Sequence, residues 1–329
     1  MTAFVGVSSC HVCIGSIQPR STSSYAPVRR PLLRKAFNCK AVIAPPEQAS
    51  LRQHDGSSAK TAGQSHSCAP QLSCQTLQRL EGELDAGQSI AALRRFSDNL
   101  AKLPKTGWEA KLRPVMIELA YNLESFNPAF TAVMLKIQSS IGHSDYVKRD
   151  QALKGLIQPL AGEYGMHNGE AQGKTHRELF SEFYQDLLQE PLEGALAEQP
   201  QPPASVLLFQ QMMRDITTAG GVGVDPIEQG SYAMGYNLAI EYLADPEKTW
   251  MLESFKELDR HVLQPQHRAL KEWLFLEIHA EGEAGHAAIG HGAVLSFVPA
   301  EHESTLRRAM CDHDRDFSAF YNKLADMLQ

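Results

Sequence analysis

The amino-acid sequence predicts an all-α fold: one helical bundle over residues 76–329, preceded by a disordered N-terminal extension. Three observations support this prediction. From about residue 76 onward, apolar residues recur at helical spacing in long segments. No segment shows convincing alternation of apolar and polar residues, so no β-strand is expected. The helical segments are joined by short turns, which is typical of a compact bundle.

The first 46 residues have the composition of a transit peptide. Residues 1–46 contain no Asp or Glu, but they hold many Ser residues and six Arg or Lys residues. Acid-poor segments rich in Arg and Ser are typical of organellar import signals. Because the segment is more Ser- and Pro-rich than amphipathic, a chloroplast is favoured over a mitochondrion. We therefore expect a chloroplast transit peptide over residues 1–46 and a mature protein in the stroma.

Residues 47–75 are expected to form a disordered linker. They mix Ser, Gly, Gln, Ala and His without any period. The six cysteines of the chain show neither a zinc-finger spacing nor a disulfide framework. The linker therefore joins the N-terminal segment to a helical domain that does not depend on disulfide bonds.

Composition narrows the function of the helical domain. The chain carries a formal net charge of −7 and is 43% hydrophobic, which is ordinary for a globular protein. An acidic balance argues against a nucleic acid or an anionic membrane surface as the main partner. No run of about 18 apolar residues occurs, so no membrane-spanning helix is expected.

The helical signals can be followed along the chain. A glycine-containing segment at 162–173 separates two of them, and three prolines within residues 199–203 break the chain later. The helices are predicted at residues 77–96, 118–123, 129–141, 146–160, 176–188, 204–217, 227–244, 247–261, 266–297 and 302–328.

The last predicted helix, 302–328, is highly charged. His302 and His313, which belong to it, are therefore expected to be exposed to solvent.

One predicted helix carries three metal-ligand residues on a single face. His279, Glu283 and His286 stand at positions i, i+4 and i+7, within roughly 60° of one another around the helix. Two imidazoles and a carboxylate that project together suit Fe, Mn or Zn. The alternative is a solvated face with chance histidines. Small residues between the three favour the metal hypothesis, because they let a neighbouring helix approach: Ala280, Gly282, Ala284 and Gly285.

Further ligands are expected on neighbouring helices. Glu163 lies at the end of one predicted helix, and His176 opens the next. Glu241 lies in mid-helix with apolar neighbours on both sides, where a carboxylate is costly to bury unless it is paired or binds a metal. Helical bundles build two-iron sites from such inward-facing Glu and His residues.

These residues carry a resemblance to a known family. The pattern of His279, Glu283 and His286 is similar to the last-helix motif of the haem-oxygenase-like di-iron oxidases. The segment Glu163-Tyr164-Gly165, followed by His176-x-x-Leu179-Phe180, resembles a second element of that family. The resemblance covers roughly residues 110–300 and implies a haem-oxygenase-like helical bundle. It also implies six metal ligands, namely Glu163, His176, Glu241, His279, Glu283 and His286.

The sequence departs from the family pattern in two places. The interval between the first two ligands is longer than usual and contains His167 and Glu170, either of which could replace an expected ligand. Glu283 stands where the family usually has Asp. His291 falls off the ligand face, so it is expected to support a ligand through a hydrogen bond, or to serve as an alternative ligand.

The resemblance implies a non-haem iron enzyme that activates O2 and oxidises a small organic substrate. Two irons per chain are expected, with Mn as an alternative metal, and a plastid ferredoxin is the electron donor that the compartment suggests. Other readings stay open: a haem-binding or cofactor-free member of the same fold, or a non-catalytic plastid binding protein. The absence of His between residues 67 and 142, where the first helices lie, counts against haem.

Overall fold

In a computed structural model of the protein, the described residues are 70–142, 145–167, 170–171, 173–198 and 203–329. The predicted transit peptide and most of the predicted linker lie outside these ranges. None of the helices in the described ranges is both long enough and apolar enough to cross a membrane. The α-helices are α1 (Cys74–Asp85), α2 (Gln88–Ala101), α3 (Trp108–Ile141), α4 (Tyr146–Glu163), α5 (His176–Leu188), α6 (Leu192–Glu198), α7 (Pro203–Thr218), α8 (Pro226–Leu258), α9 (Leu274–Phe297) and α10 (Glu303–Met327). Short helical turns lie at η2 (Ala219–Gly221), η3 (Asp259–Leu263), η4 (Gln264–Gln266) and η5 (Ala300–His302).

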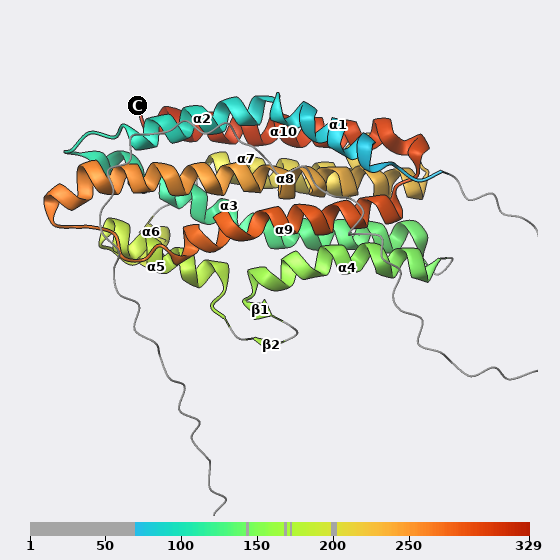
Figure 1. The fold of residues 1–329 in the computed structure, drawn as a ribbon, viewed down its shortest axis with the longest axis horizontal. Helices are drawn as coiled ribbons and strands as arrows, with labels where there is room; N and C mark the ends of the chain where they lie inside the picture. Colours follow the sequence, from blue (N-terminus) through green and yellow to red (C-terminus); the bar gives the residue numbers. More distant parts are fainter. Residues whose placement is uncertain (1–69, 143–144, 168–169, 172, 199–202) are drawn as a thin grey trace, which may run out of the picture. The chain divides into compact units, whose positions relative to one another are not determined.

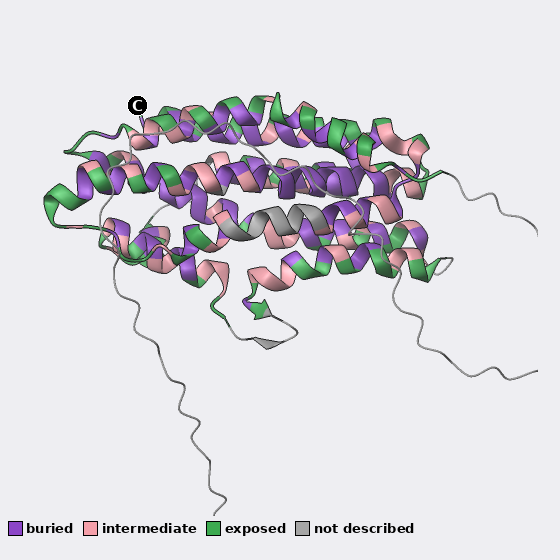
Figure 2. Cartoon of the chain, viewed as in Figure 1, coloured by how far each residue is buried: buried purple, intermediate pink, exposed green. Residues whose placement is uncertain are grey.

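The long helix α8 lies in the middle of the bundle (Figure 1). It packs against α9, α10, α2 and α3. In addition, α10 lies along α2, and α9 lies along α4, so α8 has helices on several sides. Figure 2 shows the consequence: residues 230–247 are buried, apart from Asp245. A helix buried in this way needs apolar residues around its circumference, which explains why its sequence lacks a clear polar face.

Two predicted helix breaks do not occur. The predicted segments 227–244 and 247–261 form one helix, α8, that continues across Pro246, and α3 likewise continues across Pro128. A proline inside a helix removes one backbone hydrogen bond. Packing of both helices against several neighbours compensates for that loss, and such packing is not visible in a local sequence pattern.

The predicted helix 266–297 begins too early in the sequence, because α9 starts eight residues later. His267 has φ +59°, a left-handed conformation that ends the preceding helical turn. Asp186 then accepts hydrogen bonds from the backbone N–H groups of Lys271 and Glu272, at 2.6 and 3.0 Å. A side-chain carboxylate from α5 therefore holds this segment instead of helical hydrogen bonds.

A short hairpin connects α4 to α5, contrary to the expectation that the chain has no strand. β1 (Met166–His167) pairs antiparallel with β2 (Glu170–Ala171). The sequence between them is Asn168-Gly169, the two-residue signal of a tight hairpin, which the helical periodicity of the flanking segments does not reveal. The base of the hairpin is closed at Gly165, which has φ +68° and whose carbonyl accepts the N–H of Gly173 at 3.1 Å. A Cβ at Gly165 would meet the Gly173 carbonyl oxygen at 2.5 Å, so only glycine fits there.

The expectation that His302 and His313 lie in solvent is wrong. His313 is only 2% exposed, and its ring contacts those of Tyr236 and Phe317. The His302 side chain is mostly covered, and its Nε2 lies 3.3 Å from a carboxylate oxygen of Asp225. Most charged residues of α10 are exposed, whereas His313 lies on the face that packs into the bundle, together with Asp314, whose carboxylate accepts the backbone N–H of Ser89 at 2.8 Å.

Gly155 allows α4 to pack closely against α9. A Cβ at this position would lie 2.7 Å from the Ala293 Cβ and 3.2 Å from the Ile289 carbonyl oxygen. We expect Gly155→Ala to lower the free energy of unfolding by about 1–3 kcal/mol, because the two helices must separate. Gly162→Ala on the same helix is the control: nothing lies within 4 Å of its Cβ, so a gain of about 0.5–1 kcal/mol is expected. Urea unfolding measures both, and equal stabilities would contradict the close approach.

Candidate metal centre

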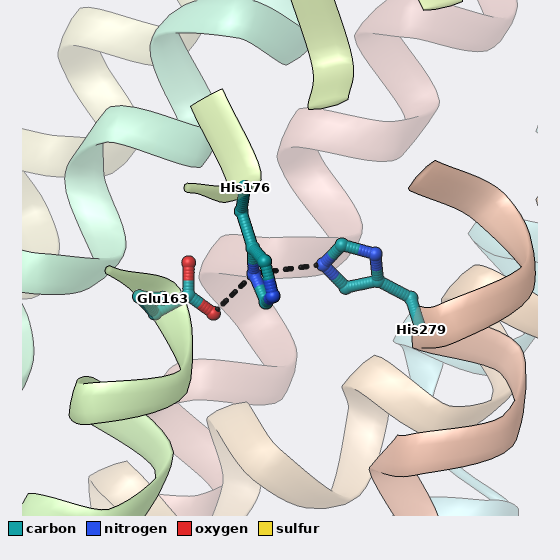
Figure 3. A group of neighbouring side chains, drawn as sticks. All are labelled: Glu163, His176 and His279. Carbon is teal, nitrogen blue, oxygen red and sulfur yellow. Dashed lines mark hydrogen bonds and ion pairs between the residues drawn. The ribbon is translucent and has the colours of Figure 1, made fainter. Parts of the chain in front are cut away.

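Three ligand-type side chains converge from three helices. Glu163 is the last residue of α4, His176 is the first residue of α5, and His279 lies in α9. Figure 3 shows the three side chains pointing toward one another. Nδ1 of His176 lies 2.9 Å from Oε1 of Glu163 and 3.1 Å from Nε2 of His279. One ligand atom from each residue lies within 4.8 Å of the other two.

The start of α5 fixes the position of His176. Thr175 is the N-cap residue, and its hydroxyl accepts the backbone N–H of Glu178 at 3.1 Å. The Glu178 carboxylate in turn accepts the backbone N–H of Thr175 at 2.7 Å. This reciprocal capping box determines the direction in which the first turn leaves the hairpin. His176 is thereby directed toward the carboxylate at the end of α4.

The end of α4 favours a cation. Unpaired carbonyls give the last turn of a helix a partial negative charge. Glu163 adds a full negative charge at the same place, and its side chain is only 15% exposed. Burying a carboxylate without a counter-charge costs free energy. The Glu163 side chain therefore favours a positively charged neighbour, either a metal ion or a protonated histidine.

The ring of His279 is held in the orientation of a metal ligand. Its Nδ1 lies within hydrogen-bond distance of the Phe275 carbonyl oxygen one turn earlier in α9. A carbonyl only accepts, so Nδ1 carries the hydrogen and the Nε2 lone pair faces His176. Metal-binding histidines are commonly held in this way by a hydrogen bond from their other ring nitrogen.

Aromatic residues cover the buried side of the centre. His279 is 4% exposed, and the Phe275 ring lies 4.5 Å from its ring. Phe180 of α5 lies edge-on to Phe275, with ring centroids 5.1 Å apart, and is itself buried. An apolar surrounding limits water and strengthens electrostatic interactions at the ligand atoms.

Two of the three separations between the ligand atoms match those around a bound metal ion, and the third is no more than 4.8 Å. Nδ1 of His176 faces two acceptors, the Glu163 carboxylate and the Nε2 lone pair of His279. A single N–H would have to be shared between them, whereas a cation satisfies all three atoms. Ligand atoms about 2.1 Å from a metal, at angles of 90–109°, lie about 3.0–3.4 Å apart, close to the observed 2.9 and 3.1 Å. Two histidines and one carboxylate are the ligand set of non-haem Fe(II) oxygenases.

The other expected ligands are placed only in part. Glu241 lies in α8 and is 4% exposed, as its apolar neighbours predict, but it is not part of the group of three. Glu283 and His286 lie in α9, four and seven residues after His279. Their side chains lie outside the described part of the structure, so their ligand roles stay predictions.

Of the alternative ligands His167, Glu170 and His291, only His291 has a described side chain, and it is not part of the group of three. His167 and Glu170 face each other in the hairpin register, and their side chains lie outside the described part. His291 of α9 is buried, and its Nε2 contacts the carboxylate of Glu81 in α1. Sequence reasoning missed Glu81, although its spacing from Leu77 and Leu84 places it on the buried face of its helix.

Comparisons with known proteins support the fold. No protein-family model and no curated protein matches the chain. Two crystal structures of a CADD-like protein of unknown function from Nostoc punctiforme PCC 73102 are similar, with TM-scores of 0.58 and 0.56 at 15% and 14% identity. Both alignments cover 77% of this chain, and they cover 96% and 94% of those chains.

A TenA homolog from Pseudomonas syringae pv. tomato str. DC3000 is also similar, with a TM-score of 0.52 at 14% identity. The alignment covers 82% of this chain and 100% of the homolog. At these identities the likeness concerns the fold alone. The resemblance to di-iron oxidases therefore continues to rest on the sequence motifs and the geometry of the centre. The chain has the all-α, helical-bundle fold that its sequence predicts.

Proposed function

We propose that this protein is a non-haem iron enzyme that uses O2 to oxidise a small organic substrate. The observation that carries the proposal is the convergence of Glu163, His176 and His279, with ligand atoms 2.9 and 3.1 Å apart. Glu241 on the adjoining helix, with Glu283 and His286 one and two turns farther along α9, would complete a site for two irons.

Each residue has a separate task in this proposal. Bound iron would supply the electrons that reduce O2. Glu163 balances the positive charge of the metal, and the Phe275 carbonyl keeps the lone pair of His279 directed at it. Phe180 and Phe275 keep water away from one side of the centre. Three protein ligands leave coordination positions for further side chains, O2 or substrate.

The cellular setting is part of the proposal. The acid-poor segment 1–46 supports import into a chloroplast. In the stroma, a ferredoxin would be the electron donor. The substrate and this donor are the partners that the proposed chemistry requires.

Anaerobic reconstitution with ferrous iron tests the metal assignment. We expect two irons per chain after removal of excess metal, and a transient visible absorption when O2 is admitted. Protein loaded with redox-inert Zn²⁺ and treated identically is the control, and it should show no absorption change. A protein that retains no iron, or iron that O2 does not oxidise, would overturn the proposal. One iron per chain would overturn the two-iron arrangement.

A further inference from the structure

A groove of about 750 Å³ runs between α3 and α7. Pro128, Ala132 and Leu135 of α3 and Met213 of α7 give it an apolar lining. Tyr164, at the end of α4, lies at its edge. Leu135 and Tyr164 are 61% and 52% exposed, which is unusual for large side chains that contribute to one hollow.

One cation in this groove lacks a carboxylate partner. Nζ of Lys136 donates to the Thr217 carbonyl at 2.7 Å, and no carboxylate in the described ranges pairs with it. An ammonium group has three hydrogens to donate, so two remain for a ligand. By contrast, Lys174 and Arg177 on the neighbouring α5 side each pair with glutamates. A half-buried lysine over an apolar lining favours an anionic head group with an apolar body.

The groove has a defined direction relative to the metal centre. Arg177, next to His176, forms an ion pair with Glu124 of α3 at 3.5 Å. Glu124 precedes Asn127 in α3, so Arg177 and the neighbouring His176 approach α3 on the Asn127 side of Lys136. Tyr164, which directly follows Glu163 in the chain, also lines the groove. Lys136 comes nine residues after Asn127 in α3, which places it about 13 Å farther along the helix axis.

We propose that this groove binds an amphipathic monocarboxylate, with the carboxylate on Lys136. The apolar body then lies along Leu135, Ala132 and Pro128 and points its far end toward the metal centre. An extended chain of about ten carbons spans this distance. That the ligand is the substrate rests on the proposed function, whereas the binding itself does not require a metal.

Calorimetric titration of decanoate into the metal-free, full-length protein tests the binding site. We expect decanoate to bind, and Lys136→Met to weaken its binding about tenfold, because a charge-assisted hydrogen bond is lost. Decan-1-ol should bind both proteins equally. Leu135→Asp, a substitution at an exposed position, should abolish binding of decanoate. Lys154→Met, at an exposed lysine of α4 outside the groove, is the matched control and should bind decanoate like the wild type.

Several outcomes would overturn the proposal: no binding of decanoate, equal binding by the Lys136→Met variant, or equal loss in the Lys154→Met control. A separate NMR experiment tests the orientation of the bound ligand. Decanoate labelled with ¹³C at C1 or at C10 is bound to Mn²⁺-loaded protein, and the widths of the two ¹³C lines are compared. Paramagnetic broadening should be larger at C10, and larger broadening at C1 would reverse the assigned direction. If the protein binds neither Mn²⁺ nor Fe(II), the metal centre is refuted, while the titration of the metal-free protein still decides whether the groove binds decanoate.

Discussion

We expect the His279→Ala variant to lose iron binding while the bundle stays folded. His279 supplies one of three converging ligand atoms, and its ring orientation is fixed by the Phe275 carbonyl. Loss of a residue that merely orients a ligand typically costs 10–100-fold in metal affinity, so loss of a direct ligand should cost at least about 100-fold. Competition of the protein with a chelator for Fe(II) measures the affinity, and circular dichroism checks the fold.

The same competition experiment separates a metal site from a general effect of removing histidines. His176→Ala should cause a loss of similar size, and the double variant should lose little more, because both residues act on one ion. His267→Asn is the control, since His267 is exposed and asparagine tolerates its left-handed backbone. Near-wild-type Fe(II) affinity in either alanine variant would refute the assignment of Glu163, His176 and His279 as one centre.

His313→Leu is expected to stabilise the protein, and to do so most strongly in acid. Both ring nitrogens of His313 are buried, and neither has a hydrogen-bond partner within the described part of the chain. Burial lowers the pKa of this histidine to about 3, from an ordinary value near 6.5. The folded protein therefore keeps the ring neutral where the unfolded chain already binds a proton. This contribution to stability is fully present above pH 6.5 and is lost progressively as the pH falls toward 3.

The difference between the folded and unfolded pKa of His313 sets the size of the change in stability. Between pH 6.5 and 5 the wild type should lose roughly 2 kcal/mol of unfolding free energy through this residue alone, at about 1.4 kcal/mol per pH unit. Leucine should also remove the cost of two unpaired polar atoms at neutral pH, about 1–3 kcal/mol. Urea unfolding of His313→Leu and wild type at pH 7, 6 and 5 measures the difference. A difference that stays constant with pH would show that His313 is not the acid-sensitive group.

The sequence predicted the parts of the centre that depend on local signals. Glu163 at a helix end and His176 at a helix start follow from glycine and turn patterns in the chain. The burial of Glu241 follows from its apolar neighbours. Spatial convergence of residues 163, 176 and 279 could only be inferred from a family resemblance, because it depends on the packing of α4, α5 and α9.

The errors also have physical causes. The charged residues beside His313 predict that it is exposed to solvent. However, His313 also falls in the spacing of three and four residues that marks the buried face of α10, and this pattern is the better guide. The other residues of that face are Leu306, Met310, Phe317, Tyr321 and Leu324. The late start of α9 depends on a carboxylate from another helix, which no local pattern contains. The Asn168-Gly169 signal was present, but the flanking strands are only two residues long and lack a clear alternation.

The hairpin between α4 and α5 bears on how this centre should be sought in other sequences. Twelve residues separate Glu163 from His176, yet the chain returns to its starting point through the closed base at Gly165 and Gly173. A spacer anchored in this way can gain or lose residues at its tip without changing the distance between the two ligands. Alignment gaps in this interval are therefore weak grounds for excluding a relative, and the residues that border the spacer are the better guide.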